Sequence, residues 1–250
     1  VDNVRNLIKP ETKLVICTHA SNVFGFRFPI ERICALCHAY RILFCVDSAQ
    51  SAGVFDIDVG TNQYDFVCMS GHKSLYGPMG TGVLILNNRN LKPLLYGGTG
   101  TESVKKSQPE GLPEKFESGT QNMNGISGLK AGVDFVKNRG IKNNYNHEYK
   151  LAKRLFNGLA NNRKVITYNK SFDYGKVAPV VSFNIDGVYS EDLVAKLNKY
   201  GIMTRGGLHC SPLAHTTMNT IENGTVRVVP GAFNTINDIN CLLNVIRKLT

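Results

Sequence analysis

The sequence predicts an α/β protein in which a mostly parallel sheet forms a large domain and a smaller α+β domain follows it. Four short apolar runs rich in Val, Ile and Phe indicate the sheet, and they lie at residues 13–17, 42–47, 65–69 and 82–86. None of them alternates with polar residues, which is typical of strands buried on both faces, as in a parallel sheet. Strand and helix signals begin again after residue 179, which predicts the second domain.

A helix is predicted between the first two runs, from Pro29 to Arg41. Its apolar residues recur at the spacing of one helix face, namely Ile30, Ile33, Cys34 and Cys37. Proline suits the first turn of a helix because that turn does not need its N–H. Strand, helix and strand in this order imply a right-handed crossover connection.

The second half of the chain alternates helix and strand signals. We expect helices around 125–138 and 146–161, a strand at 179–185, a helix at 190–200, a strand around 225–229 and a last helix at 236–249. Ser190 is a candidate N-cap and Gly201 a candidate stop for the third of these helices. Thr235 and Asp238 suit a capping box at the last one.

The domain boundaries follow from this order of elements. We expect a large domain over residues 1–130 and a small domain over residues 145–250, joined by the long helices. The segment 97–118 is rich in Gly, Ser, Pro and Lys, and a connection of this length is usually functional or mobile.

Composition narrows the function classes. The 250 residues include 29 basic and 19 acidic side chains, a net charge of +10, which favours phosphate groups or an acidic protein as partners. No block of adjacent Lys or Arg with interleaved aromatics points to nucleic acid, and no apolar run is long enough to cross a bilayer. Seven cysteines at irregular spacing argue against a disulfide framework and for a reducing compartment, so we expect a cytoplasmic protein.

Five polar residues at or just after the ends of the second and third apolar runs suit pyridoxal phosphate. They are Asp47, Gln50, Ser70, His72 and Lys73. Lys73 offers an amine for a Schiff base, and Asp47 a carboxylate that keeps a pyridine nitrogen protonated. Such sheets bind ligands beyond the carboxyl ends of their strands, where Asp47 and Ser70 are expected. The alternatives are a surface lysine and a turn aspartate.

Cys210 differs from the other cysteines in its surroundings. It lies in a polar, Gly-rich stretch at 206–224, beside His209 and near Arg205, where a thiol is a candidate thiolate nucleophile or a merely exposed group. Arg205 and Arg227 flank this stretch, and an arginine fork can hold a substrate carboxylate, although a structural ion pair is the simpler explanation. Three other cysteines fall inside apolar strands, where a buried thiol is expected: Cys17, Cys45 and Cys68.

Two further patterns suggest metal or haem, and neither is convincing. The stretch Cys34-Ala-Leu-Cys37-His38 matches a haem attachment pattern, but both cysteines belong to the apolar face of the predicted helix. His209, Cys210 and His215 are too few and too loosely spaced for a structural zinc site. We therefore expect no metal.

Together, these residues resemble the class V aminotransferase family of pyridoxal-phosphate enzymes, in particular its cysteine desulfurase and selenocysteine lyase branch. Six matching stretches occur in family order across nearly the whole chain: Thr18–Gly25, Val46–Gln50, Ser70–Pro78, Phe116–Asn122, Arg205–His215 and Thr225–Thr235. The resemblance implies the aspartate-aminotransferase-like fold, type I of the pyridoxal-phosphate enzymes, and a homodimer. The N-terminal portion of the family is absent from this sequence, so we expect a fragment of a longer polypeptide that binds cofactor weakly alone.

The resemblance also implies which residues hold the cofactor. Lys73 would bind it as a Schiff base, Asp47 would pair with the pyridine nitrogen and Gln50 with the ring oxygen. Asn22 is expected beside it. The phosphate would be bound by three polar residues, of which the last acts across a dimer interface: Ser70, His72 and Thr120.

The implied reaction is the removal of sulfur from L-cysteine. Asn22 and Arg227 would hold the substrate carboxylate, with Arg205 nearby, and Lys73 would move protons at the substrate Cα. The Cys210 thiolate would attack the substrate sulfur, which leaves a persulfide on Cys210, releases L-alanine and supplies sulfur to an acceptor protein.

Three alternatives to a cysteine desulfurase stay open. Selenocysteine lyase would use the same residues, while a class V aminotransferase would not need a nucleophilic thiol. A non-catalytic scaffold role in sulfur transfer is the alternative outside the enzymes.

Overall fold

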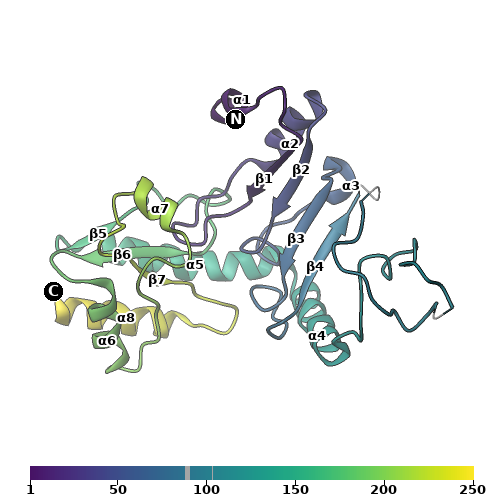
Figure 1. The fold of residues 1–250 in the computed structure, drawn as a ribbon. Coiled ribbons are helices and arrows are strands. Elements are labelled where there is room, and N and C mark those ends of the chain that lie inside the picture. The colour runs from purple at the N-terminus through teal and green to yellow at the C-terminus, as the bar shows by residue number, and fades with distance from the viewer. Residues whose placement is uncertain (88–90, 103) are drawn as a thin grey trace.

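The structure is a computed structural model that describes residues 1–87, 91–102 and 104–250. Two sheets organise this part of the chain, one of four strands and one of three strands. Figure 1 shows the four-stranded sheet in the purple and blue half of the chain and the three-stranded sheet in the green half, with helix α5 extending between them. Of the long connection expected at 97–118, Ser103 lies outside the described residues.

The first sheet confirms the four predicted strands. Its order is β1 (Leu14–Thr18), β2 (Leu43–Asp47), β3 (Phe66–Ser70) and β4 (Gly82–Leu86). The first three strands are parallel, and β4 is antiparallel to β3. Residues 71–81 between β3 and β4 are too few for a crossover to a parallel strand, so the chain reverses direction there. The sheet is therefore mostly parallel, as predicted.

One face of this sheet is covered by α2 (Ile30–Ala39), which confirms the predicted helix and its apolar face. Cys34 and Cys37 are buried there against Phe44, Val46 and other strand residues, so they belong to the core. Two short helices, α1 (Asp2–Leu7) and α3 (Val59–Asn62), belong to the same part of the chain.

The expectation that these strands are buried on both faces is wrong for the described residues. Ile16 is 67% exposed and Leu84 53% exposed, and Cys68, which was expected to be a buried thiol, is exposed. The antiparallel register places Cys68 directly opposite Leu84, so both side chains point to the same face. The residues of β2 and β3 that pack with α2 lie on the other face.

Two consecutive helices lead to the second sheet. Helix α4 (Met123–Arg139) ends at Gly140, and α5 (Ile141–Ala160) begins directly after it, earlier than the expected start at residue 146. Gly140 has a φ of 85°, a left-handed conformation that glycine adopts without strain, so the chain changes direction there without a loop.

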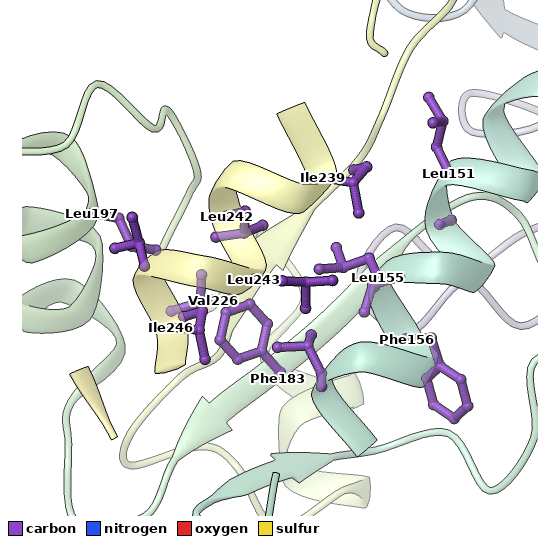
Figure 2. Close-up of a cluster of buried hydrophobic side chains, with 14 of the residues drawn as sticks. Leu151, Leu155, Phe156, Phe183, Leu197, Val226, Ile239, Leu242, Leu243 and Ile246 are labelled. Atoms are coloured by element: carbon purple, nitrogen blue, oxygen red, sulfur yellow. The ribbon is translucent and has the colours of Figure 1, made fainter. Parts of the chain in front are cut away.

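The second sheet is antiparallel and supports the C-terminal core. It consists of β5 (Val165–Thr167), β6 (Val181–Ile185) and β7 (Val226–Val228), and it packs with α5, α6 (Ser190–Asn198) and α8 (Ile236–Leu249). Figure 2 shows Leu242, Leu243 and Ile246 of α8 close to Phe183 of β6 and Leu155 of α5, and all five are buried. The predicted strands and helices of this half are confirmed, while the three-residue strand β5 was not predicted.

The helix caps give a mixed result. Thr235 and Asp238 form the predicted capping box of α8. Ser190 is not the N-cap of α6, because the helix begins at Ser190 itself, after Tyr189. Its hydroxyl instead accepts the backbone N–H of Gly207 at 3.0 Å, which ties α6 to the Gly-rich stretch before Cys210. Within the described ranges, no helix has the length and apolar character needed to span a membrane.

Candidate active site

A cavity of about 530 Å³ opens at the carboxyl ends of β1 and β2, where a sheet of this kind is expected to bind a ligand. Its lining comes from both halves of the chain, including the short helix α7 (Pro212–Thr217). The cavity brings together five of the residues that the sequence analysis singled out: Asn22, Asp47, Gln50, Lys73 and Cys210.

A second cavity of about 400 Å³ adjoins the first, since Asp47 and Ala49 line both. Ser70 and His72 line it, and the Ser70 hydroxyl lies 3.1 Å from Nδ1 of His72. The structure therefore places these two expected phosphate-binding residues together, in a cavity that shares Asp47 with the one lined by Cys210.

The turn that carries Lys73 is held by backbone hydrogen bonds. Gly71 donates to the carbonyl of Thr81 (3.0 Å), Gly77 donates to the carbonyl of Gly71 (2.8 Å), and Tyr76 donates to the carbonyl of Lys73 (2.9 Å). Thr81, which the sequence analysis missed, also lines the second cavity. Its role was not evident from the sequence because Thr81 lies between Gly80 and Gly82, directly before β4 rather than at the carboxyl end of a parallel strand.

Three glycines of α4 let this helix pack closely on the lysine turn, and the sequence analysis did not single them out. A Cβ at Gly132 would lie 2.3 Å from the carbonyl oxygen of Leu75, and one at Gly128 would lie 3.1 Å from the ring of Pro78. A Cβ at Gly125 would lie 2.9 Å from the methyl group of Thr81. Their spacing along the helix is the signal that could have identified this face.

The backbone just after β2 orients the carboxylate of Asp47. Oδ1 accepts the backbone N–H of Ala49 at 3.0 Å. This contact leaves acceptor capacity on the carboxylate, which has two oxygens. Asp47 lines both cavities, which makes its carboxylate a candidate partner for a ligand bound there.

Asn22 fixes the residues on both sides of Cys210. Its Nδ2 donates to the carbonyl of His209 (2.7 Å), and its Oδ1 accepts the hydroxyl of Ser211 (2.7 Å). His209 and Cys210 have φ values of 51° and 60°, a left-handed conformation that residues other than glycine rarely adopt. The Asn22 contacts therefore hold Cys210, which is exposed, at the edge of the cavity.

His209 does not supply a positive charge beside Cys210. Its ring is buried, and Nε2 lies 2.9 Å from the carbonyl oxygen of Thr225, which identifies Nε2 as the donor. Burial, with smaller contributions from neighbouring cations including Arg227, lowers the pKa of His209 to about 4. The imidazole is therefore neutral at pH 7.

Arg227 lies next to Asn22, and Arg205 lies next to Arg227. A guanidinium N–H of Arg227 donates to the carbonyl of Asn22 at 2.8 Å. Burial and the charge of Arg205 lower the pKa of Arg227, and the interaction with Cys210 opposes this shift. Arg205 pairs with Arg227 through the backbone, while its side chain is exposed.

The structure does not bring Thr120 to either cavity. Thr120 is exposed and does not line them. Its expected role across a dimer interface stays a prediction. Across the described residues, no three or more His, Cys, Asp or Glu side chains gather in a group that could hold a metal ion.

Comparison with known proteins gives the family. The model of the class-V aminotransferases matches residues 1–242. The chain belongs to this family. It is 35% identical to a probable cysteine desulfurase of Pyrococcus abyssi, over 95% of this chain and 59% of that protein. It is 34% identical to a probable cysteine desulfurase of Halalkalibacterium halodurans, over 99% of this chain and 61% of that protein.

Solved structures agree with this family assignment. An apo cysteine desulfurase of Thermococcus onnurineus NA1 is 34% identical, with a TM-score of 0.88 over 95% of this chain and 60% of that one. The cysteine desulfurase CsdA of Escherichia coli is 29% identical, with a TM-score of 0.88 over 99% of this chain and 61% of that one. The predicted fold class is thereby confirmed. The chain spans about three fifths of the length of these relatives.

Proposed function

We propose that this protein is a pyridoxal-phosphate-dependent cysteine desulfurase, which removes sulfur from L-cysteine and leaves it as a persulfide on Cys210. The observation that carries the proposal is the shared lining of the 530 Å³ cavity by an amine, a carboxylate and a thiol, those of Lys73, Asp47 and Cys210. An aminotransferase needs the first two groups and has no use for the third.

The residues around the two adjoining cavities fit pyridoxal phosphate. Lys73 would hold it covalently, Asp47 would pair with its ring nitrogen, and Gln50 lines the same cavity for its ring oxygen. Ser70 and His72 line the adjoining cavity, where their hydroxyl and imidazole suit a phosphate group. The cofactor would supply an electron sink for charge that develops at the substrate Cα.

The protein's own residues would carry out three tasks. Arg227, with Arg205 nearby, would bind the substrate carboxylate. The amine of Lys73 would take the proton from the substrate Cα and return a proton later. The Cys210 thiolate would attack the substrate sulfur, so that a sulfur–sulfur bond forms while the carbon–sulfur bond breaks and its electron pair stays with the carbon. The carbon then takes up a proton to give L-alanine, and no external oxidant or reductant is needed.

Asn22 positions the loop that carries the nucleophile, because its side chain is hydrogen-bonded to His209 and Ser211 on either side of Cys210. Arg227 adjoins this loop through its hydrogen bond to the carbonyl of Asn22. In this proposal Arg227 serves the substrate carboxylate, and the neutral His209 contributes no charge to the site.

The persulfide sulfur would pass from Cys210, which is exposed, to an acceptor protein. We also propose a homodimer, in which the exposed Thr120 reaches the phosphate site of a second protomer.

The test is to incubate the purified protein, loaded with pyridoxal phosphate, with L-cysteine and to map the sulfur adduct by mass spectrometry. We expect one added sulfur on Cys210, with L-alanine as product, and loss of both in Cys210→Ala. Cys241→Ala is the matched control, because Cys241 is also exposed but does not line the cavity.

Four outcomes would contradict the proposal. Desulfuration that survives intact in Cys210→Ala would remove the nucleophile. A keto acid as product would indicate an aminotransferase, and strong preference for L-selenocysteine would indicate a selenocysteine lyase. Cofactor absorbance that persists in Lys73→Ala would remove the lysine assignment.

A further inference from the structure

Glu148 is a buried acidic residue that the proposed reaction does not use. It lies on α5 and is 4% exposed. It lines a third cavity, of about 100 Å³, together with Lys73 and Gln50, which also line the large cavity. The lysine therefore adjoins two cavities, one with the candidate substrate groups and one with Glu148.

Tyr76 joins Glu148 to the lysine turn. Its backbone N–H donates to the carbonyl of Lys73 (2.9 Å), and its hydroxyl donates to Oε1 of Glu148 (3.1 Å). The same hydroxyl accepts the backbone N–H of Ala232 (2.9 Å), which lies in the loop after β7. Since β7 carries Arg227, one tyrosine hydroxyl connects the turn of the amine with α5 and with the segment that follows the arginine strand.

The backbone of Tyr76 depends on these partners. Its φ of 56° is left-handed, a conformation that is rare for a tyrosine and persists where the surroundings hold it. Its ring contacts Phe135 of α4 and Phe233 of the loop after β7 edge-on, with centroid distances of 5.2 and 5.8 Å. The hydroxyl contacts therefore complete the support of a strained residue three positions after Lys73.

We propose that Glu148 is a positioning residue, which acts through the Tyr76 hydroxyl to hold the amine of Lys73 in register with Arg227. The inference rests on the proposed function, in which Arg227 holds the substrate carboxylate while Lys73 moves a proton at the substrate Cα. A misplacement of about 1 Å in such an arrangement costs about 100-fold in rate. A link between the Lys73 turn and the Arg227 strand therefore affects the rate, although in this proposal Glu148 contacts neither substrate nor cofactor.

The charge of Glu148 changes near neutral pH. Burial raises the pKa of Glu148 to about 7, and the hydrogen bond from Tyr76 and the charge of Arg139 on α4 oppose this shift. Besides Glu148, the described residues that line the small cavity include one other Lys, Arg, Asp or Glu side chain, that of Lys73. An ionised carboxylate accepts a stronger hydrogen bond than a neutral carboxyl, so the link becomes stronger as pH rises through 7.

The test compares four variants of the protein loaded with pyridoxal phosphate. Tyr76→Phe and Glu148→Ala remove the link, Glu148→Gln keeps an acceptor without the charge, and Tyr149→Phe removes a similar hydroxyl contact of α5, to Phe172, away from the lysine turn. We expect the first two to lower kcat for desulfuration about 10- to 100-fold while KM changes less than about threefold. Glu148→Gln should keep most of the wild-type kcat at pH 6.5. It should lack the increase in kcat that the wild type shows as pH rises through 7, because glutamine does not ionise. Tyr149→Phe should match the wild type.

Hydrogen exchange gives a readout that does not need turnover. The amides of Tyr76 and Gly77 are hydrogen-bonded in the lysine turn, so Glu148→Ala should speed their exchange about tenfold or more. Unchanged kcat and exchange in Glu148→Ala, or equal losses in Tyr149→Phe, would overturn the proposal. If Glu148→Ala fails to fold, the comparison of Tyr76→Phe with Tyr149→Phe tests the proposal instead. If the wild type does not desulfurate cysteine at all, the proposed function fails, but the exchange rates still show whether Glu148 supports the lysine turn.

Discussion

Asn22 donates a 2.7 Å hydrogen bond from its side-chain amide to the carbonyl of His209, a residue 187 positions further along the chain. Its Oδ1 accepts the hydroxyl of Ser211, so the two residues that flank Cys210 are held by one side chain. Asn22 was expected to bind the cofactor and the substrate carboxylate, and both roles stay predictions. In this structure its amide group is already engaged by the loop that carries the thiol, which makes it a support of that loop.

Asn22→Ala should therefore loosen the loop before it affects the cofactor. Both hydrogen bonds are lost, and each contributes about 0.5–1.5 kcal/mol. We expect the amide of Ser211, which donates to the carbonyl of Leu208, to exchange about tenfold faster or more, and persulfide formation on Cys210 to slow about 10-fold or more. Cofactor absorbance should be retained. Hydrogen exchange and the rate of sulfur uptake measured by mass spectrometry check this.

Ser211→Ala is the matched control, because it removes one of the two bonds and leaves the contact to His209. Its effects should lie between those of the wild type and Asn22→Ala. Wild-type exchange at Ser211 in the Asn22→Ala protein would show that the loop is held by other contacts.

His209 should make the protein less stable in acid. Its pKa is about 4 in the folded protein against an ordinary value of 6.5, because burial disfavours the charged imidazole. Below pH 6.5 the unfolded chain binds a proton that the folded chain does not, so stability falls as pH drops from 6.5 towards 4. The loss from this residue is about 2 kcal/mol at pH 5.

His209→Gln should remove that loss, because glutamine keeps an N–H for the carbonyl of Thr225 and does not titrate. Urea unfolding at pH 7 and pH 5 measures it. If the difference in unfolding free energy between the two pH values is the same in the variant and the wild type, the imidazole is not the group responsible.

Glu148 has the opposite effect on the pH dependence. Burial raises its pKa from 4.5 to about 7, so above pH 4.5 the unfolded chain releases a proton that the folded chain keeps. Stability from this residue is present at low pH and is lost as pH rises through 7, by roughly 3 kcal/mol at pH 8. Glu148→Gln should therefore unfold at higher urea concentration than the wild type at pH 8, with a smaller difference at pH 5. Equal midpoints at pH 8 would contradict a raised pKa for this buried carboxyl.

The strands and long helices could be predicted because their signals are local. The apolar runs identified β1 to β4 within about a residue at each end, and the capping residues Thr235 and Asp238 identified the start of α8. Residue types at the strand ends also identified Asp47 and Lys73, which the cavity brings together. The polar, Gly-rich surroundings of Cys210 indicated its thiol, and the resemblance to a known family added Asn22.

What could not be predicted depends on contacts between distant segments. The exposure of Cys68 follows from which face of the sheet α2 covers, and a strand pattern does not contain that information. The burial of His209 follows from its contact with Thr225 rather than from its neighbour Cys210. The link from Glu148 to Tyr76 joins residues 72 positions apart, and neither lies in a pattern that indicates the other.

The glycines of α4 give a last prediction, because two of them differ in the atoms that a methyl group would meet. At Gly132 a Cβ would lie 2.3 Å from the carbonyl oxygen of Leu75 and 2.7 Å from the carbonyl carbon of Tyr76, and this backbone cannot move aside without moving the lysine turn. At Gly128 the nearest atoms are ring carbons of Pro78 at 3.1 Å, which need a shift of only a few tenths of an ångström.

Gly132→Ala should therefore lower the free energy of unfolding by about 1–3 kcal/mol, the usual cost of inserting a methyl group into a packed site. Gly128→Ala should be close to neutral, because alanine favours a helix by up to about 1 kcal/mol over glycine and offsets the small clash. Urea unfolding separates the two. Since the displaced backbone belongs to the turn of Lys73, Gly132→Ala should also weaken binding of pyridoxal phosphate, measured by absorbance titration, whereas Gly128→Ala should not. Equal stability and equal cofactor binding in the two variants would mean that packing against α4 does not hold the lysine turn in place.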